Sequence, residues 1–294
     1  MTTVPEAKDA YIGRFAPSPS GPLHFGSLVA AVASYLDARS HQGSWLLRID
    51  DLDPARELST APAEIMDQLL QHGLVWDGDI LFQSSRLASY QQARNQLTAD
   101  NRLYPCSCSR KDTPRIYAGH CLTNSLQDLS QPHAIRFHIK EPKFEIHDRL
   151  LGPIKWRQQL DMGDFIVLRK DGLNAYQLAV VVDDIYQGIT DVLRGADLIH
   201  STPLQLSLFK ALNSTPPRYC HVPVVLAADG RKLSKQAFAE TVSRKSAVDN
   251  IRNALNFLGQ KHTKGHSVNE LLESATRSWN IQAVPPLRGI SEKI

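Results

Sequence analysis

A strand–turn–helix–strand pattern near the N-terminus constrains the fold more than any other feature of the chain. Residues 11–16 predict a short strand, and a turn rich in proline, serine and glycine follows over residues 17–22. Apolar residues then recur at helical spacing until Gly43, and residues 45–50 predict a buried strand that ends in an acid. Two strands joined by a helix are typical of a βαβ unit with a parallel sheet.

The rest of the chain predicts an α/β protein with an insertion. Helices are expected over residues 62–73, 87–97 and 204–212 and beyond Ser246, and buried strands over 177–184 and 222–226. The stretch from 103 to 165 holds three of the four cysteines and has irregular apolar spacing. We therefore expect four parts: a first half of a Rossmann-type domain (1–102), an insertion (103–170), a second half (171–240) and a short helical C-terminal part (241–294).

Composition excludes several classes of protein. With 42% hydrophobic and 21% charged residues among 294, the chain is neither disordered nor fibrous, and its net charge of +3 only permits an anionic partner. It has no apolar run long enough to cross a membrane and no secretory signal at its N-terminus. A cytoplasmic protein with reduced thiols is expected.

Two segments have the chemistry of a phosphate site. A helix that begins near Gly26 would offer free N–H groups to an anion, with His24 beside it and Gly21 allowing close approach. Residues 229–235 form a basic turn that includes Lys232 and Lys235 and suits a departing pyrophosphate. Taken singly, a capping turn with a surface histidine and a solvated basic turn explain these segments better.

Together the two segments resemble the signature motifs of class I aminoacyl-tRNA synthetases. Residues 24–27 (His-Phe-Gly-Ser) match the position of the motif written HIGH, and residues 232–236 (Lys-Leu-Ser-Lys-Gln) match that of KMSKS. The resemblance implies that His24, Lys232 and Lys235 are catalytic and that ATP binds with Mg²⁺. The ATP-binding residues that it implies are Pro17, Gly21, His24, Gly26, Ser27, Lys232, Ser234 and Lys235.

The flanking residues look like the glutamate-specific branch of that class. Segments 14–21, 47–53, 176–184 and 188–198 carry this resemblance over most of residues 11–240. A glutamate pocket must hold two carboxylates, which arginine forks suit, and one ammonium, which an acid can pair with. The pocket residues implied by the resemblance are Arg14, Ala16, Ser18, Asp50, Tyr176 and Arg194.

Two details of that pocket differ from a simple match. The family commonly has glutamate where this chain has Asp50, so the shorter acid must reach the ammonium, directly or through water. Arg14 has the alternative role of a structural ion pair with one of the acids at 50–53.

The cysteines suggest a structural zinc site in the insertion. Cys106, Cys108 and Cys121 supply three soft ligands where a closed site wants four. Ligand chemistry favours His120 as the fourth, whereas the family resemblance implies Tyr117. Three free thiols remain the alternative to a metal site, and Cys220 is expected to be a core thiol.

The position of the basic loop narrows the family further. About sixty residues follow this loop, so a few helices and no anticodon-reading domain are expected there. The combination resembles the glutamyl-queuosine tRNA(Asp) synthetases, paralogues of glutamyl-tRNA synthetase. That resemblance implies activation of L-glutamate by ATP without tRNA, and its transfer to the queuosine base at the wobble position of tRNA(Asp). The implied partner is the anticodon stem-loop, and a monomer that binds no membrane is expected.

Two other functions stay open on sequence alone. One is a truncated glutamyl-tRNA synthetase that charges a tRNA 3′ end. The other is a non-catalytic, synthetase-like glutamate sensor or RNA-binding module. No anticodon domain is expected in this chain, which argues against the truncated synthetase. The presence of His24, Lys232 and Lys235 argues against the non-catalytic module.

Overall fold

The computed structural model describes residues 10–109, 111, 113–114, 116–123, 130–227, 242, 246–260 and 264–291. Within these residues, β1 (Ile12–Phe15) pairs in parallel with β2 (Ser44–Ile49), and β2 pairs in parallel with β3 (Leu81–Phe82). The helix α1 (Phe25–Ser40) connects β1 to β2. The βαβ unit predicted from the sequence is confirmed.

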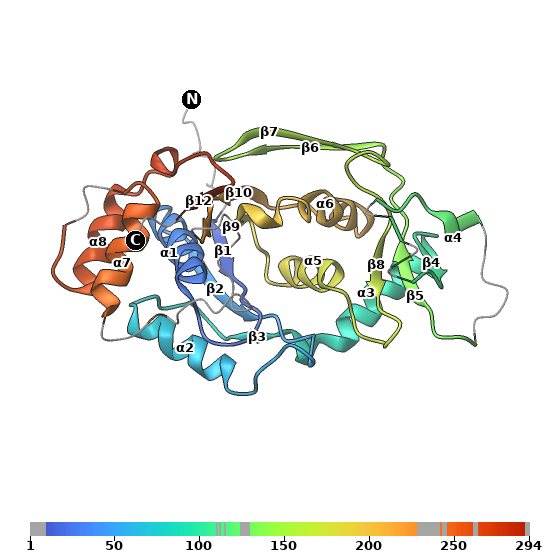
Figure 1. Ribbon diagram of the computed structural model, residues 1–294, viewed down its shortest axis with the longest axis horizontal. Helices are drawn as coiled ribbons and strands as arrows, with labels where there is room; N and C mark the ends of the chain where they lie inside the picture. The colour runs from blue at the N-terminus through green and yellow to red at the C-terminus, as the bar shows by residue number, and fades with distance from the viewer. Residues whose placement is uncertain are drawn as a thin grey trace, which may run out of the picture.

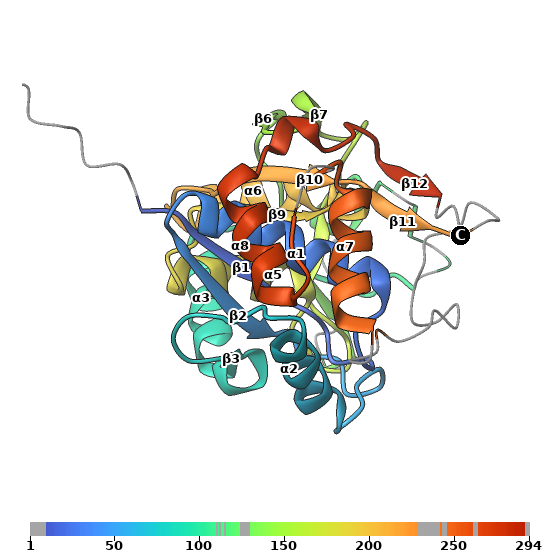
Figure 2. The same cartoon turned by 90° about the vertical axis from the view of Figure 1, so that its left-hand side faces the viewer.

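A second parallel pair extends this sheet. The strands β9 (Asp191–Gly195) and β10 (Arg218–Val222) pair in parallel and are connected by α6 (Thr202–Ala211). They meet the first set where the Thr190 N–H donates to the Ile12 carbonyl at 3.0 Å. The lateral order is thus β3-β2-β1-β9-β10, as Figure 2 shows, which is the order of a doubly wound Rossmann sheet.

Helices cover both faces of the sheet. On one face, α1 packs against α7 (Ala247–Phe257) and α8 (Val268–Ser278), and on the other lie α6 and α5 (Tyr176–Tyr186) (Figure 1). Alternate residues of β2 enter the two cores: Trp45 and Leu47 join the α1 side, and Leu46 the α5 side. Burial on both faces is what a parallel sheet requires.

The described residues of the insertion form two small antiparallel sheets. Strands β4 (Leu103–Cys106), β5 (Ala134–Phe137) and β8 (Phe165–Leu168) form one, with the short helix α4 (His120–Thr123) beside it. The other is the hairpin described next. The division into four parts remains a prediction, although these sheets do fall within residues 103–170.

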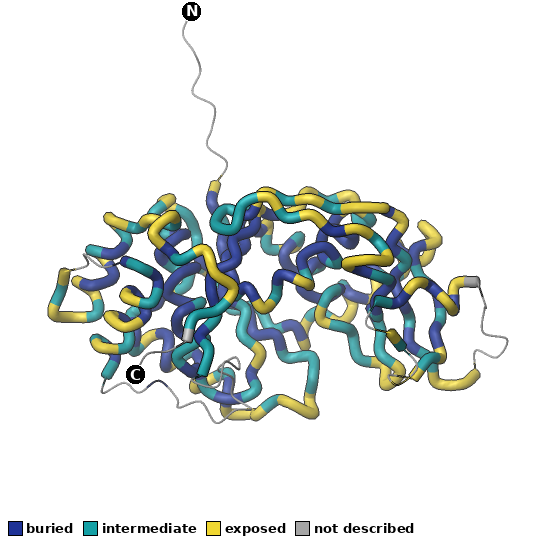
Figure 3. The backbone as a smooth tube through the Cα atoms, turned by 45° about the horizontal axis from the view of Figure 1, so that its top comes forward, coloured by how far each residue is buried: buried dark blue, intermediate teal, exposed yellow. Residues whose placement is uncertain are grey.

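The hairpin of β6 (Lys143–Asp148) and β7 (Gly152–Arg157) runs back over the molecule towards β10. Exposed and partly buried residues alternate along most of it, which gives it a solvent face (Figure 3).

The remaining elements are short connections and helices at the periphery. They are α2 (Ala61–Gln71), η1 (Gln83–Arg86), α3 (Leu87–Ala99), η2 (Ala196–Leu198), β11 (Val224–Leu226), η5 (Ile281–Ala283) and β12 (Gly289–Ser291). Among the helices in the described part of the chain, none combines the length and apolar character that crossing a bilayer demands.

The strand predicted over residues 177–184 is wrong, because this segment lies in α5. A short, continuous apolar run fits a buried helix as well as a buried strand. Here α5 packs against both α3 and α6, so apolar side chains are buried on several of its faces. Its acids are buried too: Asp183 accepts hydrogen bonds from Tyr90 (2.6 Å) and Gln83 (2.9 Å).

The strand predicted over 222–226 is divided at Pro223. Val222 ends β10, and β11 begins at Val224 and pairs in parallel with β12 near the C-terminus. Proline has no N–H to donate to a sheet, so it breaks the ladder at this point. The C-terminal part, predicted as helical, does contain α7 and α8 but also supplies the strand β12.

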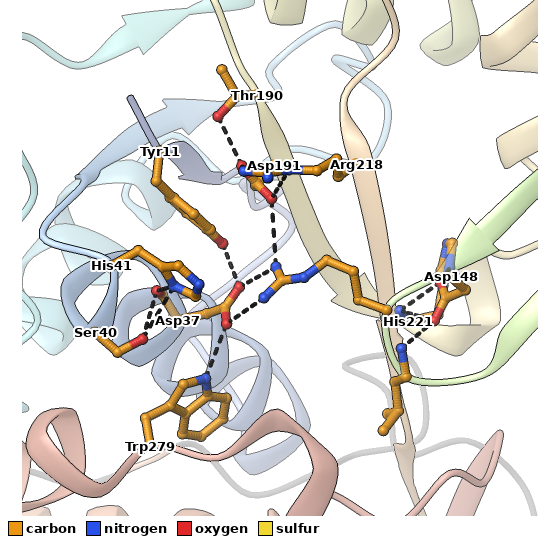
Figure 4. Close-up of polar contacts among 12 residues, drawn as sticks. Tyr11, Asp37, Ser40, His41, Asp148, Thr190, Asp191, Arg218, His221 and Trp279 are labelled. Carbon is orange, nitrogen blue, oxygen red and sulfur yellow. Dashed lines mark hydrogen bonds and ion pairs between the residues drawn. The ribbon is translucent and has the colours of Figure 1, made fainter. Parts of the chain in front are cut away.

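A buried carboxylate connects the hairpin to the sheet. Asp37 of α1 accepts from the Tyr11 hydroxyl (2.5 Å) and the Trp279 indole (3.0 Å), as Figure 4 shows. It also accepts from both terminal nitrogens of Arg149, at 2.5 and 3.0 Å. Burial raises the pKa of Asp37, but donation from Arg149 outweighs it and keeps that pKa below its usual value. Because Arg149 lies in the β6–β7 turn, this network holds the hairpin against α1.

Candidate active site

A cavity of about 920 Å³ opens at the carboxyl ends of the parallel strands. Its lining includes Ala16 after β1, Asp50 after β2, Asp197 after β9 and Pro223 after β10. It lies between β1 and β9, from which the connecting helices α1 and α6 depart to opposite faces. Ligands of open α/β sheets bind at this kind of switch point.

Most of the residues predicted for ligand binding line this cavity. All six residues expected for glutamate do so: Arg14, Ala16, Ser18, Asp50, Tyr176 and Arg194. Of those expected for ATP, Pro17, His24, Gly26 and Ser27 line it, whereas Gly21 does not. Gly21 instead makes the preceding turn with a φ of 137°, which favours glycine. Lys232, Ser234 and Lys235 lie outside the described residues.

The N-terminus of α1 faces the cavity with an oriented histidine. His24 is the N-cap, and its Nδ1 accepts from the Ser27 N–H at 3.3 Å. Since Nδ1 accepts, Nε2 carries the ring hydrogen and lies 3.1 Å from the Ser27 hydroxyl. A Cβ at Gly26 would come within 3.1 Å of the His24 imidazole, so glycine at this position leaves space for the ring.

Four buried charges form a cluster at the cavity, where Arg14 and Asp50 line it and Arg48 and Asp184 lie behind them. Arg48 is fully buried and bridges two acids, with 2.8 Å from Nε to Asp50 and 2.6 Å from a terminal nitrogen to Asp184. Arg14 joins the same cluster through Nε, 3.3 Å from Asp184. The alternative pairing of Arg14 with an acid at 50–53 is therefore not what the structure has.

The protonation of the two acids in this cluster differs. Burial raises the pKa of Asp50 to about 6, because the opposing effect of Arg48 only partly offsets desolvation. Burial also raises the pKa of Asp184, but Arg14 and Arg48 together outweigh it and lower that pKa below its usual value. Asp50, which faces the cavity, is thus the acid whose charge responds to pH near neutrality.

Arg194 reaches the cavity from β9 and is held on several sides. Its Nε donates to His221 Nε2 (3.2 Å), and its terminal nitrogens donate to Gln205 (2.8 Å) and Thr202 (2.9 Å). Tyr176, the first residue of α5, is 38% exposed, so its ring forms an accessible wall.

The cysteines of the insertion converge at one point. The Sγ atoms of Cys106, Cys108 and Cys121 lie within 4.8 Å of one another. The hydroxyl of buried Tyr117 lies 3.7 Å from Cys106 Sγ and 3.5 Å from Cys108 Sγ. His120 is exposed.

Arg136 supports this cluster from beneath. Its Nε donates to Cys106 Sγ at 3.1 Å, and its guanidinium lies 3.8 Å from the centre of the Tyr117 ring. Burial raises the pKa of the Cys106 thiol, but donation from Arg136 and its neighbours outweighs this and lowers the pKa to about 7.

Comparison with known proteins identifies the family. Residues 12–282 match the family model of the catalytic domain of class I tRNA synthetases (E and Q). A Glutamyl-Q tRNA(Asp) synthetase of Chromobacterium violaceum is 45% identical over 94% of this chain and 95% of its own length. The chain belongs to the glutamyl-Q tRNA(Asp) synthetase family. Proteins of the same name from Pseudomonas syringae (44% identical; 97% and 98% covered) and Escherichia coli K12 (45%; 94% and 91%) agree.

A solved structure shows the same fold. The crystal structure of a glutamate tRNA ligase from Elizabethkingia meningosepticum in complex with its amino acid superposes with a TM-score of 0.81 at 21% identity. The match covers 96% of this chain and 67% of that one. The predicted resemblance, the Rossmann-type parallel sheet and the class of enzyme, a class I synthetase-type ligase, are confirmed.

Several residues around the cavity escaped sequence reasoning. Arg48 and Asp184 form the buried charge cluster, and Asp148 and His221 lie behind Arg194. A polar or charged side chain inside a buried strand, such as Arg48 or His221, signals a buried partner. The sequence does not indicate which distant acid that partner is.

Proposed function

We propose that this chain activates L-glutamate with ATP, without tRNA, and transfers it to the queuosine base at the wobble position of tRNA(Asp). The observation that carries the proposal is that all six residues expected to surround glutamate line one switch-point cavity, among them two arginines and an acid. The names of the relatives, which cover nearly the whole chain, support the acceptor.

Glutamate is held in this proposal by charges of opposite sign. The guanidinium groups of Arg14 and Arg194 bind carboxylates, and Asp50 binds the ammonium through the oxygen that Arg48 leaves available. Tyr176 walls the pocket with its ring. The Asp50 side chain is shorter than the glutamate common in the family. Its ion pair with Arg48 fixes the position of the carboxylate that must reach the ammonium.

Activation takes place beside the N-terminus of α1. An oxygen of the glutamate α-carboxylate attacks the α-phosphorus of ATP, and pyrophosphate leaves with the electron pair of the broken P–O bond. The N-terminus of α1 and His24 stabilise the phosphate charge, with Lys232 and Lys235 assigned the leaving pyrophosphate by family resemblance. Mg²⁺ accompanies ATP and neutralises its phosphates. A queuosine hydroxyl then attacks the adenylate carbonyl, and AMP departs.

The acceptor is tested with labelled glutamate and tRNA(Asp) that lacks its 3′-terminal adenosine. We expect this RNA to be labelled when it carries queuosine and to stay unlabelled when it carries guanosine instead. Labelling only of intact tRNA at its 3′ end would support a truncated glutamyl-tRNA synthetase instead. Absence of glutamate-dependent ATP–pyrophosphate exchange would support a non-catalytic sensor.

The cysteine cluster fits a structural Zn²⁺ site with Tyr117 as the fourth ligand. Zn–S bonds of about 2.3 Å in a tetrahedron separate the sulfurs by roughly 3.8 Å, close to the spacing here. The Tyr117 hydroxyl already points between two of the sulfurs, whereas His120 is exposed. The site would join β4 to α4 and so shape the insertion.

Zinc binding is tested by substituting one cysteine of the cluster. We expect the wild type to contain about one zinc per chain and Cys108→Ser to lose most of it, because three ligands hold the ion less tightly than four. Metal content by atomic emission is the measurement. Cys220→Ser, at a buried cysteine far from the cluster, is the matched control and should keep its zinc. Equal zinc content in both variants would contradict the assignment.

Glutamate affinity is expected to depend on the charge of Asp50. Only the carboxylate form pairs with the ammonium, so KM for glutamate should fall as pH rises through about 6. The same raised pKa makes folding less favourable as pH rises from 3.8 to about 6, because the unfolded chain releases this proton first. Exchange rates measured from about pH 5 to about pH 8 give the KM profile. Asp50→Asn should remove this fall of KM near pH 6. If the variant keeps the fall, another group causes it.

A further inference from the structure

A pair of fully buried titratable side chains lies behind the cavity and touches no part of it. Asp148 is the last residue of β6, and His221 belongs to β10. Their side chains are both 0% exposed, and Asp148 Oδ2 lies 2.6 Å from His221 Nδ1 (Figure 4). We propose that Asp148 and His221 are positioning residues that hold the Arg194 guanidinium in its orientation towards the substrate. This inference rests on the proposed function, because it takes Arg194 to bind a glutamate carboxylate.

The hydrogen-bond geometry fixes the tautomer of His221. A carboxylate has no hydrogen to donate, so Nδ1 must donate to Asp148 and Nε2 is left as an acceptor. That acceptor lies 3.2 Å from the Nε–H of Arg194, which donates to it. The opposite tautomer would point a ring N–H at the Arg194 N–H, and these two donors would repel. The Thr202 hydroxyl lies 3.1 Å from the same Nε2 and can donate in the first tautomer or accept in the second, so Arg194 is the group that distinguishes the two.

The charge states of the pair agree with this tautomer. Burial lowers the pKa of His221, and the hydrogen bond to Asp148 does not fully offset it, so the ring is neutral near pH 7. Burial raises the pKa of Asp148, but donation from His221 and from backbone N–H groups outweighs it and lowers that pKa. The carboxylate thus stays charged, as the tautomer requires.

Asp148 is itself immobilised by the turn that follows it. Its Oδ1 accepts from the backbone N–H groups of Leu150 (3.0 Å) and Leu151 (2.9 Å). The backbone N–H of His221 also donates to the carboxylate, at 3.1 Å from Oδ2. With the neighbouring Arg149 bound to Asp37, the end of the hairpin is a rigid support for the histidine.

The support reaches the cavity through one side chain. Arg194 is 4% exposed, lines the cavity and has its terminal nitrogens directed by Gln205 and Thr202. His221 accepts a hydrogen bond from the remaining Nε–H. Each of the three guanidinium nitrogens therefore has an acceptor, which fixes the plane of the group. A donor fork that is fixed before the ligand arrives loses less entropy when it binds a carboxylate.

The test inverts the tautomer without changing the size of the side chain. In Asp148→Asn, the Oδ1 position still accepts from the turn, and the amide NH₂ takes the place of Oδ2. This NH₂ group then donates to His221 Nδ1, so the ring hydrogen of His221 moves to Nε2 and faces Arg194. We expect KM for glutamate to rise at least about tenfold in ATP–pyrophosphate exchange, with KM for ATP changed less than about twofold. Imidazole ¹⁵N shifts should show the hydrogen on Nδ1 in the wild type and on Nε2 in the variant.

A second buried substitution separates positioning from a general loss of packing. Cys220→Ala removes a fully buried side chain from the same strand, next to His221, in the α1-side core. We expect it to lower the melting temperature but leave KM for glutamate within about twofold of the wild type. An equal rise of this KM in Cys220→Ala would overturn the proposal, as would an unchanged KM in folded Asp148→Asn.

If Asp148→Asn does not fold, two substitutions of the histidine decide. His221→Gln keeps an acceptor for Arg194, and His221→Leu does not, so the glutamine variant should have the lower KM for glutamate. Equal KM values, or a wild-type spectrum with the hydrogen on Nε2, would overturn the inference while leaving the proposed function intact. A wild type without glutamate-dependent exchange would overturn both.

Discussion

Replacing Arg14 with alanine is expected to lower kcat/KM for glutamate by about a hundredfold or more in ATP–pyrophosphate exchange. Arg14 is 5% exposed and lines the cavity, and among the described residues its hydrogen bonding is to Asp184 through Nε. Its terminal nitrogens therefore suit a substrate carboxylate. Losing one partner of a buried, charged pair costs about 3–5 kcal/mol, which corresponds to a factor between roughly 10² and several times 10³.

The same substitution at the rim of the cavity is the control. Arg56 also lines the cavity, but its side chain is 69% exposed and pairs only loosely with Asp53 at 3.6 Å. Arg56→Ala should change kcat/KM for glutamate by less than about threefold, because an exposed ion pair contributes little. Similar losses in both variants would mean that Arg14 acts through the general charge of the cavity and not through a direct contact.

Replacing Arg48 with methionine is expected to destabilise the fold by about 3–5 kcal/mol. Methionine keeps most of the volume, so the loss reports charge and not a cavity. Without Arg48, Asp50 loses its ion pair and Asp184 retains only the longer contact with Arg14. Urea unfolding measures the free energy. The remaining acids should then take up protons, which removes the negative charge available to the substrate ammonium.

The matched control for Arg48→Met is Arg157→Met. Arg157 forms an i,i+4 pair with Asp161 at 3.6 Å, and the two side chains are 69% and 39% exposed. Its loss should change the free energy of unfolding by less than about 1 kcal/mol. If Arg48→Met were as mild as this control, the buried cluster would contribute to neither the stability nor the charge of the site.

Several elements of the fold could be read from local pattern. The strand–turn–helix–strand unit and the helices α2, α3 and α6 lie where the apolar pattern and the neighbouring turn residues predict them. The segment 177–184 could not be assigned in this way. Its apolar run is buried on several faces by α3 and α6, and such burial removes the periodicity that would distinguish helix from strand.

The candidate site divides in the same manner. The residues at strand ends, such as Ala16, Ser18 and Asp50, could be predicted from the family resemblance, which agrees with the way parallel strands bring their carboxyl ends to one edge of the sheet. The partners that orient them could not. Arg48 meets Asp184, and His221 meets Asp148, across 136 and 73 positions of sequence, and no spacing rule connects residues so far apart.

By itself, the sequence determined the strand–helix–strand unit and, through motif order and strand polarity, which side chains stand at one edge of the sheet, since both are local properties. Only the tertiary structure decided how those side chains are charged and aimed. Desolvation holds the pKa of Asp50 near 6, and a buried carboxylate selects the histidine tautomer behind Arg194. Both effects depend on low dielectric and on atoms within hydrogen-bond reach, which arise only when distant segments pack together.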